Sequence, residues 1–217
     1  MRLSEPPAAS YYADSAGPPE RESAGRTREA LRGEYRADVG VVGGGIAGCS
    51  AALHLAKRGL KVALFEAHEV GYGASGRSGG QTIFGLAASQ PALAAQVGPR
   101  DARQLFDLSV EGLDLTQSLI RDHGIDCDYR ANHLHVAVKP RQLRELEQWA
   151  EELENQYAYR SVSLLDRQQL RAHLASDRYL GGLLDTRSGH LHPLKYTRGL
   201  ARAAEVFGVR IFENTQV

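Results

Sequence analysis

The sequence has little cysteine and no excess of charge of either sign. Two cysteines in 217 residues are too few for a disulfide scaffold, so we expect Cys49 and Cys127 to remain thiols in a reducing compartment. The 26 basic residues balance 26 acidic ones, and no basic cluster lines one predicted helix, so no nucleic-acid partner is expected. No stretch reaches the roughly 18 apolar residues of a membrane span, and the N-terminus lacks the apolar core of a secretion signal. These absences predict a soluble, cytoplasmic protein with no membrane partner.

A regular pattern begins near residue 37. The apolar runs Val39–Val42 and Val62–Phe65 are typical of parallel strands that are covered on both faces. Between them, the small and apolar residues of Ile46–Arg58 predict a helix, and Gly59 follows at the position where helices commonly end. The segment therefore predicts a strand–helix–strand unit of about 30 residues.

A glycine-rich turn joins the first strand to the helix. Gly43, Gly45 and Gly48 form the pattern Gly-x-Gly-x-x-Gly. In that pattern the glycines allow a tight turn, close approach of a pyrophosphate, and close packing of the helix on the strand. The backbone N–H groups of Ile46 and Ala47 would then face the phosphates at the positive end of the helix. The turn therefore predicts a dinucleotide as the ligand.

An acidic residue ends the second predicted strand. Glu66 lies about 20 residues beyond the glycine turn, the spacing at which a carboxylate accepts hydrogen bonds from the adenosine ribose. Its negative charge would repel a 2′-phosphate, which argues against NADP. These residues leave FAD and NAD both open, and a glycine-rich turn in an unrelated α/β domain is the alternative without a ligand.

The rest of the chain has a mixed pattern. Residues 1–35 are rich in Pro, Gly, Ser and charge, which predicts an extended arm. Tyr11 and Tyr12 either anchor this arm or belong to a mobile tail. Residues 67–98 are Gly-rich and predicted to be irregular. The remaining predictions are helices over Asp101–His123, 140–159 and Pro193–Phe207, strands over His133–Val138, Tyr179–Asp185 and 209–212, and a short helix capped by Asp166 that runs through His173.

Histidine pairs and one cysteine suggest two further chemistries. His133 and His135 would share a strand face, as would His190 and His192 if that segment is extended, and two such pairs could hold zinc. No cysteine or paired carboxylate has supporting spacing, so we expect no metal. Cys49 lies in the first turn of the predicted helix, where a thiol pKa can fall, but a buried small residue is the expected role. No catalytic residue is assigned.

The loop Gly73–Gln81, with the sequence Gly-Ala-Ser-Gly-Arg-Ser-Gly-Gly-Gln, is more specific than the glycine turn. With this loop, the chain resembles the FAD-dependent oxidoreductases of the D-amino-acid-oxidase-like (DAO) superfamily. Within that superfamily it is most similar to the gamma-glutamylputrescine oxidase and amine oxidase branch. The resemblance covers nearly all of the chain and is also carried by Ser10–Ala13, Val41–Gly48, Ala51–Ala56, His133–Pro140 and His190–Tyr196.

The resemblance implies where FAD would lie. The loop would run beside the flavin, because small residues permit close backbone approach and Arg77 can balance pyrophosphate charge. The family more often has Asn at the position of Ser78. A backbone contact to adenine is implied on a strand matching Thr215–Val217. The expected FAD-binding residues are Gly43, Gly45, Ile46, Ala47, Gly48, Glu66, Ala67, Ala74, Ser75, Gly76, Arg77, Ser78, Gly80, Gln81 and Val217.

The resemblance also implies a reaction. An amine or amino acid would give hydride to the flavin, the imine product would hydrolyse, and dioxygen would reoxidise the flavin with release of hydrogen peroxide. The alternatives are a truncated nucleotide-binding fragment without catalysis and an NAD-linked dehydrogenase.

The implied fold class is α/β, with a Rossmann-like FAD-binding parallel sheet that is interrupted by an α+β substrate domain. The sequence ends soon after the third predicted parallel strand, so we expect an N-terminal fragment whose C-terminal half is missing. The expected division is an arm over 1–35, a first FAD-binding part over 36–98, the start of the substrate domain over 99–190, and a second FAD-binding part over 191–217.

Overall fold

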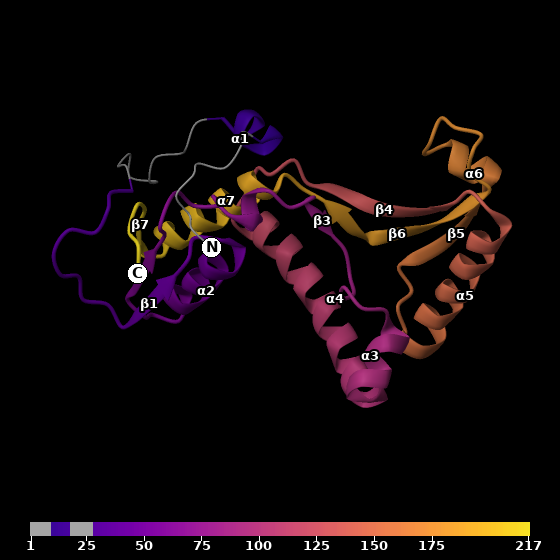
Figure 1. Ribbon diagram of the computed structural model, residues 1–217, viewed down its shortest axis with the longest axis horizontal. Coiled ribbons are helices and arrows are strands. Elements are labelled where there is room, and N and C mark those ends of the chain that lie inside the picture. Colours follow the sequence, from indigo (N-terminus) through magenta and orange to yellow (C-terminus); the bar gives the residue numbers. More distant parts are fainter. Residues whose placement is uncertain (1–9, 18–27) are drawn as a thin grey trace. The chain divides into compact units, whose positions relative to one another are not determined.

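The computed structural model describes residues 10–17 and 28–217 (Figure 1). The chain divides into two compact units, and helix α4 (Pro99–Asp122) passes from the second unit back into the first. The division after Gly80 comes earlier than the expected one at residue 98. The first unit contains the chain up to Gly80 together with Ser118–Asp128 and Leu191–Val217, and the second contains Gln81–Gln117 and Tyr129–His190.

A parallel sheet forms the centre of the first unit. Its strands are β1 (Val39–Val42), β2 (Val62–Phe65) and β7 (Arg210–Phe212), in the order β1-β2-β7. Both neighbours pair in parallel with β2, as Val39 opposite Val62 and Leu64 opposite Ile211 show. The central strand is the most apolar of the three, with Val62, Ala63 and Leu64 buried. The predicted parallel sheet is therefore confirmed.

Two helices pack on each other beside this sheet. Helix α2 (Ile46–Lys57) buries Cys49, Ala52, Leu53 and Ala56, which lie on one face at helical spacing. Helix α7 (Pro193–Val206) contacts α2 and is buried along most of its length. Gly59 and Gly208 have positive φ values of 86° and 87° directly after these helices, as expected for residues that end a helix.

The arm contacts the first unit through a short helix, α1 (Tyr11–Ser15), capped by Ser10. The ring of Tyr12 meets that of His192 edge-on with centroids 5.0 Å apart, as the anchor interpretation predicts, and Ser15 Oγ lies 3.1 Å from His192 Nε2. Tyr11 is largely exposed. The extended conformation predicted over 1–35 falls partly on residues 1–9 and 18–27, which lie outside the described residues.

An antiparallel sheet forms the second unit. Strand β6 (Gly181–His190) pairs with β3 (Gln81–Thr82), β4 (Arg130–Ala137) and β5 (Val162–Asp166). Helix α5 (Pro140–Tyr157) contacts β4, β5 and β6, and a short helix α6 (Arg167–Arg171) follows β5. The core of the unit consists of Phe106, Leu153, Tyr159 and Leu183.

Several short helices and strands were not predicted from the sequence. The stretch 67–98 was expected to be irregular, but it contains a 3₁₀ turn (Ala74–Gly76), β3 and helix α3 (Gln90–Val97). Helix α3 begins after Ser89 in the N-cap position with a proline in its first turn, a combination that favours helix starts. Strand β5 was missed because its sequence Val-Ser-Leu-Leu-Asp is neither a continuous apolar run nor a regular alternation of apolar and polar residues.

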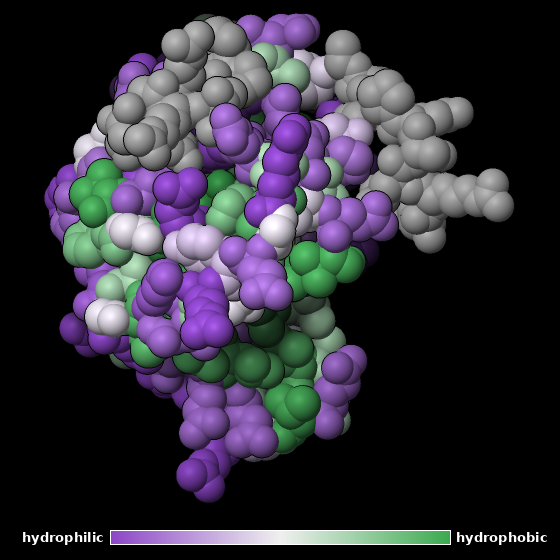
Figure 2. Space-filling model, turned by 90° about the vertical axis from the view of Figure 1, so that its left-hand side faces the viewer, coloured by the Kyte–Doolittle hydropathy of each residue, from purple (hydrophilic) through white to green (hydrophobic). Residues whose placement is uncertain are grey.

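The surface mixes polar and apolar residues. On the face in Figure 2, hydrophilic residues predominate and hydrophobic residues appear between them. In the first unit, Val42, Val206 and Phe207 are among the exposed apolar side chains. No helix within 10–17 and 28–217 is long and apolar enough to span a membrane.

Candidate dinucleotide-binding site

The turn between β1 and α2 folds tightly on itself. Gly43 has a φ of 102°, a conformation that side chains disfavour, and its N–H donates to the carbonyl of Phe65 at 2.8 Å. A Cβ on Gly48 would overlap the carbonyl oxygen of Gly43. Both positions therefore need glycine for the backbone geometry alone.

The N-terminus of α2 is built from backbone. Gly45 is the N-cap and supplies no side-chain cap, and its carbonyl accepts the first helical hydrogen bond from Cys49 N–H at 2.9 Å. The Ile46 N–H donates to Ser75 Oγ at 3.1 Å. Ala47 and Gly48 also lie in the first turn, whose N–H groups have no partner inside the helix. Together with the helix dipole, these groups suit an anionic phosphate.

The carboxylate of Glu66 is held beside this turn. Its Oε2 accepts the Gly44 N–H at 2.6 Å, and its Oε1 accepts the His68 N–H at 2.9 Å. The backbone is fixed as well, since Glu66 N–H donates to the Phe212 carbonyl and Thr215 N–H donates to the Glu66 carbonyl. Each carboxylate oxygen can accept a further hydrogen bond, so the group can also bind ribose hydroxyls.

The loop that contains Ser75 is attached to the same turn. Gly71 N–H donates to the Gly44 carbonyl at 3.0 Å. A Cβ on Gly45 would lie 2.8 Å from Ser75 Oγ, so a side chain at this position would displace the Ser75 hydroxyl from its contact with the turn. Arg77 Nε donates to the Tyr72 carbonyl at 3.0 Å, which holds the guanidinium at the loop. Backbone of the loop, the turn and the residues after β2 therefore form one hydrogen-bonded group.

The structure joins five of the fifteen predicted binding residues through hydrogen bonds. Gly43, Gly45, Ile46, Glu66 and Ser75 lie within one hydrogen-bonded group. Gln81 belongs to the second unit, where it lies in β3 and pairs with His190 of β6. The remaining predicted residues of the first unit are Ala47, Gly48, Ala67, Ala74, Gly76, Arg77, Ser78, Gly80 and Val217.

The strand predicted at 215–217 was wrong. These residues have no regular secondary structure, and the side chain of Val217 is 80% exposed. Thr215 N–H donates to the Glu66 carbonyl, although Thr215 itself is not in a strand.

Sequence reasoning missed an ion-pair group that fixes the segment after β7. Arg28, which is 6% exposed, pairs with Glu205 at 2.6 Å and with Glu213 at 3.4 Å. Glu213 Oε1 also accepts the Val70 N–H at 2.8 Å, and burial raises the pKa of this carboxyl. No pattern in the sequence marks this group, because its members come from the arm and from the last residues of the chain.

The histidine pairs do not form the arrangement that a metal would need. The rings of His133 and His135 lie 4.6 Å apart on one face of β4. His190 is exposed at the end of β6, whereas His192 is buried and caps α7 through its Nδ1, so the condition of an extended strand through both residues is not met. The chain turns into a helix at Pro193, which breaks the strand alternation. Among the described residues, no group of three or more His, Cys, Asp or Glu could hold a metal ion.

The cysteines behave as core residues. Both are buried and neither forms a disulfide within the described chain. Burial raises the pKa of the Cys49 thiol to about 12, with smaller contributions from neighbouring charges. The lowering that a helix N-terminus can cause is therefore outweighed by loss of solvent.

Comparisons with known proteins agree with this geometry. Residues 38–217 match the DAO family, described as FAD dependent oxidoreductase. The chain is 39% identical over 96% of its length to gamma-glutamylputrescine oxidoreductase of Escherichia coli, of which it covers 47%. It is 42% identical over 83% of its length to the probable oxidoreductase OrdL of Haemophilus influenzae, of which it covers 42%.

Solved structures show the same fold. The L-amino acid deaminase of Proteus myxofaciens has a TM-score of 0.69 at 24% identity, with 86% of this chain and 40% of that chain covered. Glycine oxidase of Bacillus cereus has a TM-score of 0.60 at 24% identity, with 82% and 46% covered. The chain thus spans about half the length of the curated relatives and solved structures that it matches. With its family matched along residues 38–217, the chain belongs to the DAO family of FAD-dependent oxidoreductases.

Proposed function

We propose that this chain provides the FAD-binding part of an enzyme that oxidises an amine or an amino acid. FAD is the cofactor of the family. The observation that carries the proposal is the hydrogen-bonded group in which the glycine turn, Glu66 and Ser75 meet at the N-terminus of α2. Relatives whose names specify amine or amino-acid substrates include gamma-glutamylputrescine oxidoreductase and the glycine oxidase of Bacillus licheniformis. In this proposal the first unit binds FAD and the second begins the substrate domain.

The residues of the first unit suit distinct parts of the cofactor. The N–H groups of Gly45, Ala47 and Gly48 would bind the pyrophosphate, because the Ile46 N–H already donates to Ser75 Oγ, and the Arg77 guanidinium would offset the charge of the pyrophosphate. Glu66 would accept the ribose hydroxyls while it keeps its hydrogen bonds from Gly44 and His68. Ser75 would hold the loop against the turn through the Ile46 N–H. The remaining proposed contacts in the first unit are Ala67, Ala74, Gly76, Ser78, Gly80 and the backbone of Val217, and Gln81 is a proposed contact from the second unit.

The chemistry would come from the cofactor. When bound, FAD would take hydride from the carbon that carries the substrate nitrogen, and dioxygen would reoxidise it with formation of hydrogen peroxide. The protein would bind and orient the substrate, so no side-chain acid or base is obligatory. Addition of amines or amino acids to the FAD-loaded protein without air should bleach the flavin absorbance if the proposal holds.

Titration with FAD tests the binding site directly. The purified chain should quench the fluorescence of added flavin to saturation. Glu66→Gln should weaken FAD binding by about tenfold, because a charged acceptor of ribose hydroxyls is replaced by a neutral one. Gly45→Val should abolish binding, since its side chain fills the space beside Ser75. Gly112→Ala is the matched control, because a Cβ there meets nothing within 4 Å.

Two results would contradict the proposal. One is FAD affinity that is the same in wild type, Glu66→Gln and Gly45→Val. The other is tight NADH binding by a chain that takes up no FAD, which would favour an NAD-linked enzyme.

A further inference from the structure

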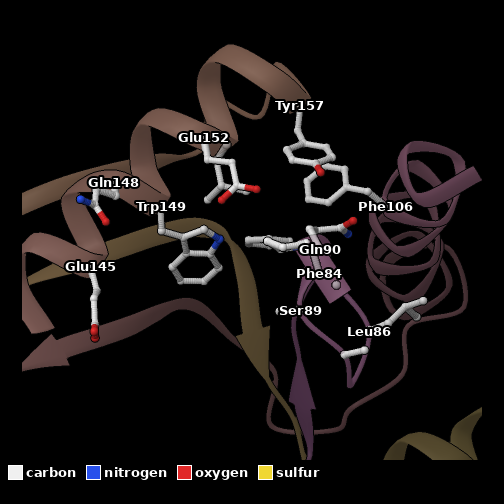
Figure 3. Close-up of a pocket in the computed structure, with 14 residues that line it drawn as sticks. Phe84, Leu86, Ser89, Gln90, Phe106, Glu145, Gln148, Trp149, Glu152 and Tyr157 are labelled. Carbon is white, nitrogen blue, oxygen red and sulfur yellow. The ribbon is translucent and has the colours of Figure 1, made fainter. Parts of the chain in front are cut away.

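A pocket of about 860 Å³ lies within the second unit, and none of the residues proposed for FAD lines it. Its volume falls in the range of small-molecule sites. The walls come from the segment after β3 and from helices α3, α4 and α5 (Figure 3). The lining residues that matter for its chemistry are Phe84, Gln90, Phe106, Trp149, Glu152 and Tyr157.

Aromatic rings form the walls. The ring centroids of Phe84 and Trp149 lie 5.9 Å apart, those of Phe84 and Phe106 lie 5.6 Å apart, and those of Phe106 and Tyr157 lie 4.4 Å apart. Such a group excludes water from an aliphatic ligand and also attracts a cation to the ring faces. Figure 3 shows Trp149, Glu152 and Tyr157 extending from α5 toward Phe84 and Gln90.

The ionisable groups of the pocket favour a positive ligand. Glu145 and Glu152 line it, and their helical spacing with Trp149 places all three on one face of α5. Glu145 is paired with Arg141 at 2.8 Å, so its charge is partly balanced. Glu152 is half-buried beside Tyr157, and its charge contributes to a raised pKa of that phenol, mainly a result of burial.

The side chain of Arg103 lies beside Tyr157 but does not line the pocket. The Arg103 guanidinium lies 5.7 Å from the centroid of Tyr157. It donates to Asp107 at 3.0 Å and to the carbonyl of Gln156 at 2.8 Å. Arg103 therefore has its own acceptors, and the carboxylate of Glu152 remains the charge that a ligand in the pocket would meet.

A buried acceptor lines the same pocket. The Oε1 atom of Gln90 is buried and accepts no hydrogen bond from any described residue. A buried acceptor without a donor is unfavourable, and rotation of the Gln90 amide toward the pocket would let a ligand N–H satisfy it. The pocket thus combines a carboxylate, an acceptor without a donor, and aromatic walls, which are three complementary features for one class of ligand.

We propose that this pocket binds a primary organic ammonium with an aliphatic body, such as an alkylammonium ion. The ammonium donates to the Glu152 carboxylate and, once the amide has rotated toward the pocket, to Gln90 Oε1, and the aliphatic body packs on Trp149 and Phe84. This inference goes beyond the proposed function, because the site lies entirely in the second unit and its occupation needs no flavin.

Intrinsic fluorescence reports on the pocket directly, because Trp149 is the single tryptophan of the chain. Butylammonium should change its emission with saturation, in the presence and in the absence of FAD. The uncharged 1-butanol and the anionic butanoate, which have the same body, should bind at least about tenfold more weakly, since each lacks the ammonium charge. Equal affinity for 1-butanol would overturn the proposal, because it would mean that only apolar contact matters.

Variants of α5 and α3 identify the polar contacts. Glu152→Gln should weaken butylammonium binding by about tenfold, and Gln90→Leu by a smaller factor, because a charged acceptor binds an ammonium more strongly than an amide does. Glu147→Gln removes a carboxylate from the same helix outside the pocket and should leave affinity unchanged. Unchanged affinity in folded Glu152→Gln, or an equal loss in Glu147→Gln, would refute the site.

A parallel FAD titration of each variant separates this proposal from the proposed function. The pocket variants should bind FAD as wild type does. Loss of ammonium binding with intact FAD binding confirms two independent sites, whereas ammonium binding that persists in Glu152→Gln leaves the FAD proposal intact and overturns this one.

Discussion

The two units build their candidate sites from different parts of the chain. In the first unit, backbone N–H and carbonyl groups of the glycine turn and the Ser75 loop form the site, and Glu66 contributes the main charged side chain. In the second unit, side chains of Phe84, Trp149 and Glu152 form the pocket. A backbone site is sensitive to an added Cβ, whereas a side-chain site can change its ligand through substitutions that leave the fold intact.

The largest effect is expected at the turn. Gly48→Ala places a methyl group on the carbonyl of Gly43, so helix and turn must separate. We expect a loss of about 3 kcal/mol in the free energy of unfolding, together with loss of FAD binding. Urea denaturation measures the stability. Gly112→Ala, in the interior of α4, should be neutral or slightly stabilising, and a similar loss in both variants would show that the turn is not special.

The second unit is stabilised by a buried hydrogen bond between the side chains of Tyr159 and Asp185. The Tyr159 hydroxyl donates to both oxygens of Asp185 at 2.9 and 3.0 Å, and Asp185 is 2% exposed. Tyr159→Phe leaves the buried carboxylate with fewer donors, so the free energy of unfolding should fall by about 2 kcal/mol. Thermal or urea unfolding measures it. Tyr157→Phe, at the pocket wall, should change stability by less than about 0.5 kcal/mol; equal losses would refute the role of the Asp185 contact.

The smallest effect concerns Cys49 beneath the turn. Its folded pKa is raised to about 12, whereas an unfolded thiol ionises near 8.5, so the folded protein keeps a proton that the unfolded chain loses. The free energy of unfolding should therefore decrease as pH rises above about 8.5, by about 1 kcal/mol between pH 8 and 9.5. Cys49→Ala should lack this component of the pH dependence. Identical pH profiles for wild type and Cys49→Ala would contradict the burial of a neutral thiol.

The same contrast explains what the sequence could predict. The strands at Val39–Val42 and Val62–Phe65 match β1 and β2, because buried parallel strands are continuous apolar runs and glycines mark their ends. The two segments that meet at Ser75 could also be recognised in the sequence. Gly45 belongs to the glycine turn and Ser75 to the loop Gly73–Gln81, and both are short local motifs.

The pocket of the second unit could not be predicted in this way. Phe84, Phe106 and Trp149 are far apart in the sequence, and only the fold brings their rings together. In the sequence, Glu152 is one of several glutamates along a predicted helix, and no pattern marks it as part of a pocket. The missed ion pair of Arg28 with Glu205 has the same cause, because pairing between distant residues leaves no local pattern.

Amide hydrogen exchange in the presence of each ligand tests most directly whether the first unit binds FAD through the backbone of the turn. FAD should slow exchange at the amides of Gly45–Gly48 and at the segment after Glu66, and should leave α5 unchanged. Butylammonium should protect residues around Gln90 and Trp149 instead. Protection by FAD that is absent from Gly45–Gly48 would contradict the assignment of the glycine turn as the dinucleotide site.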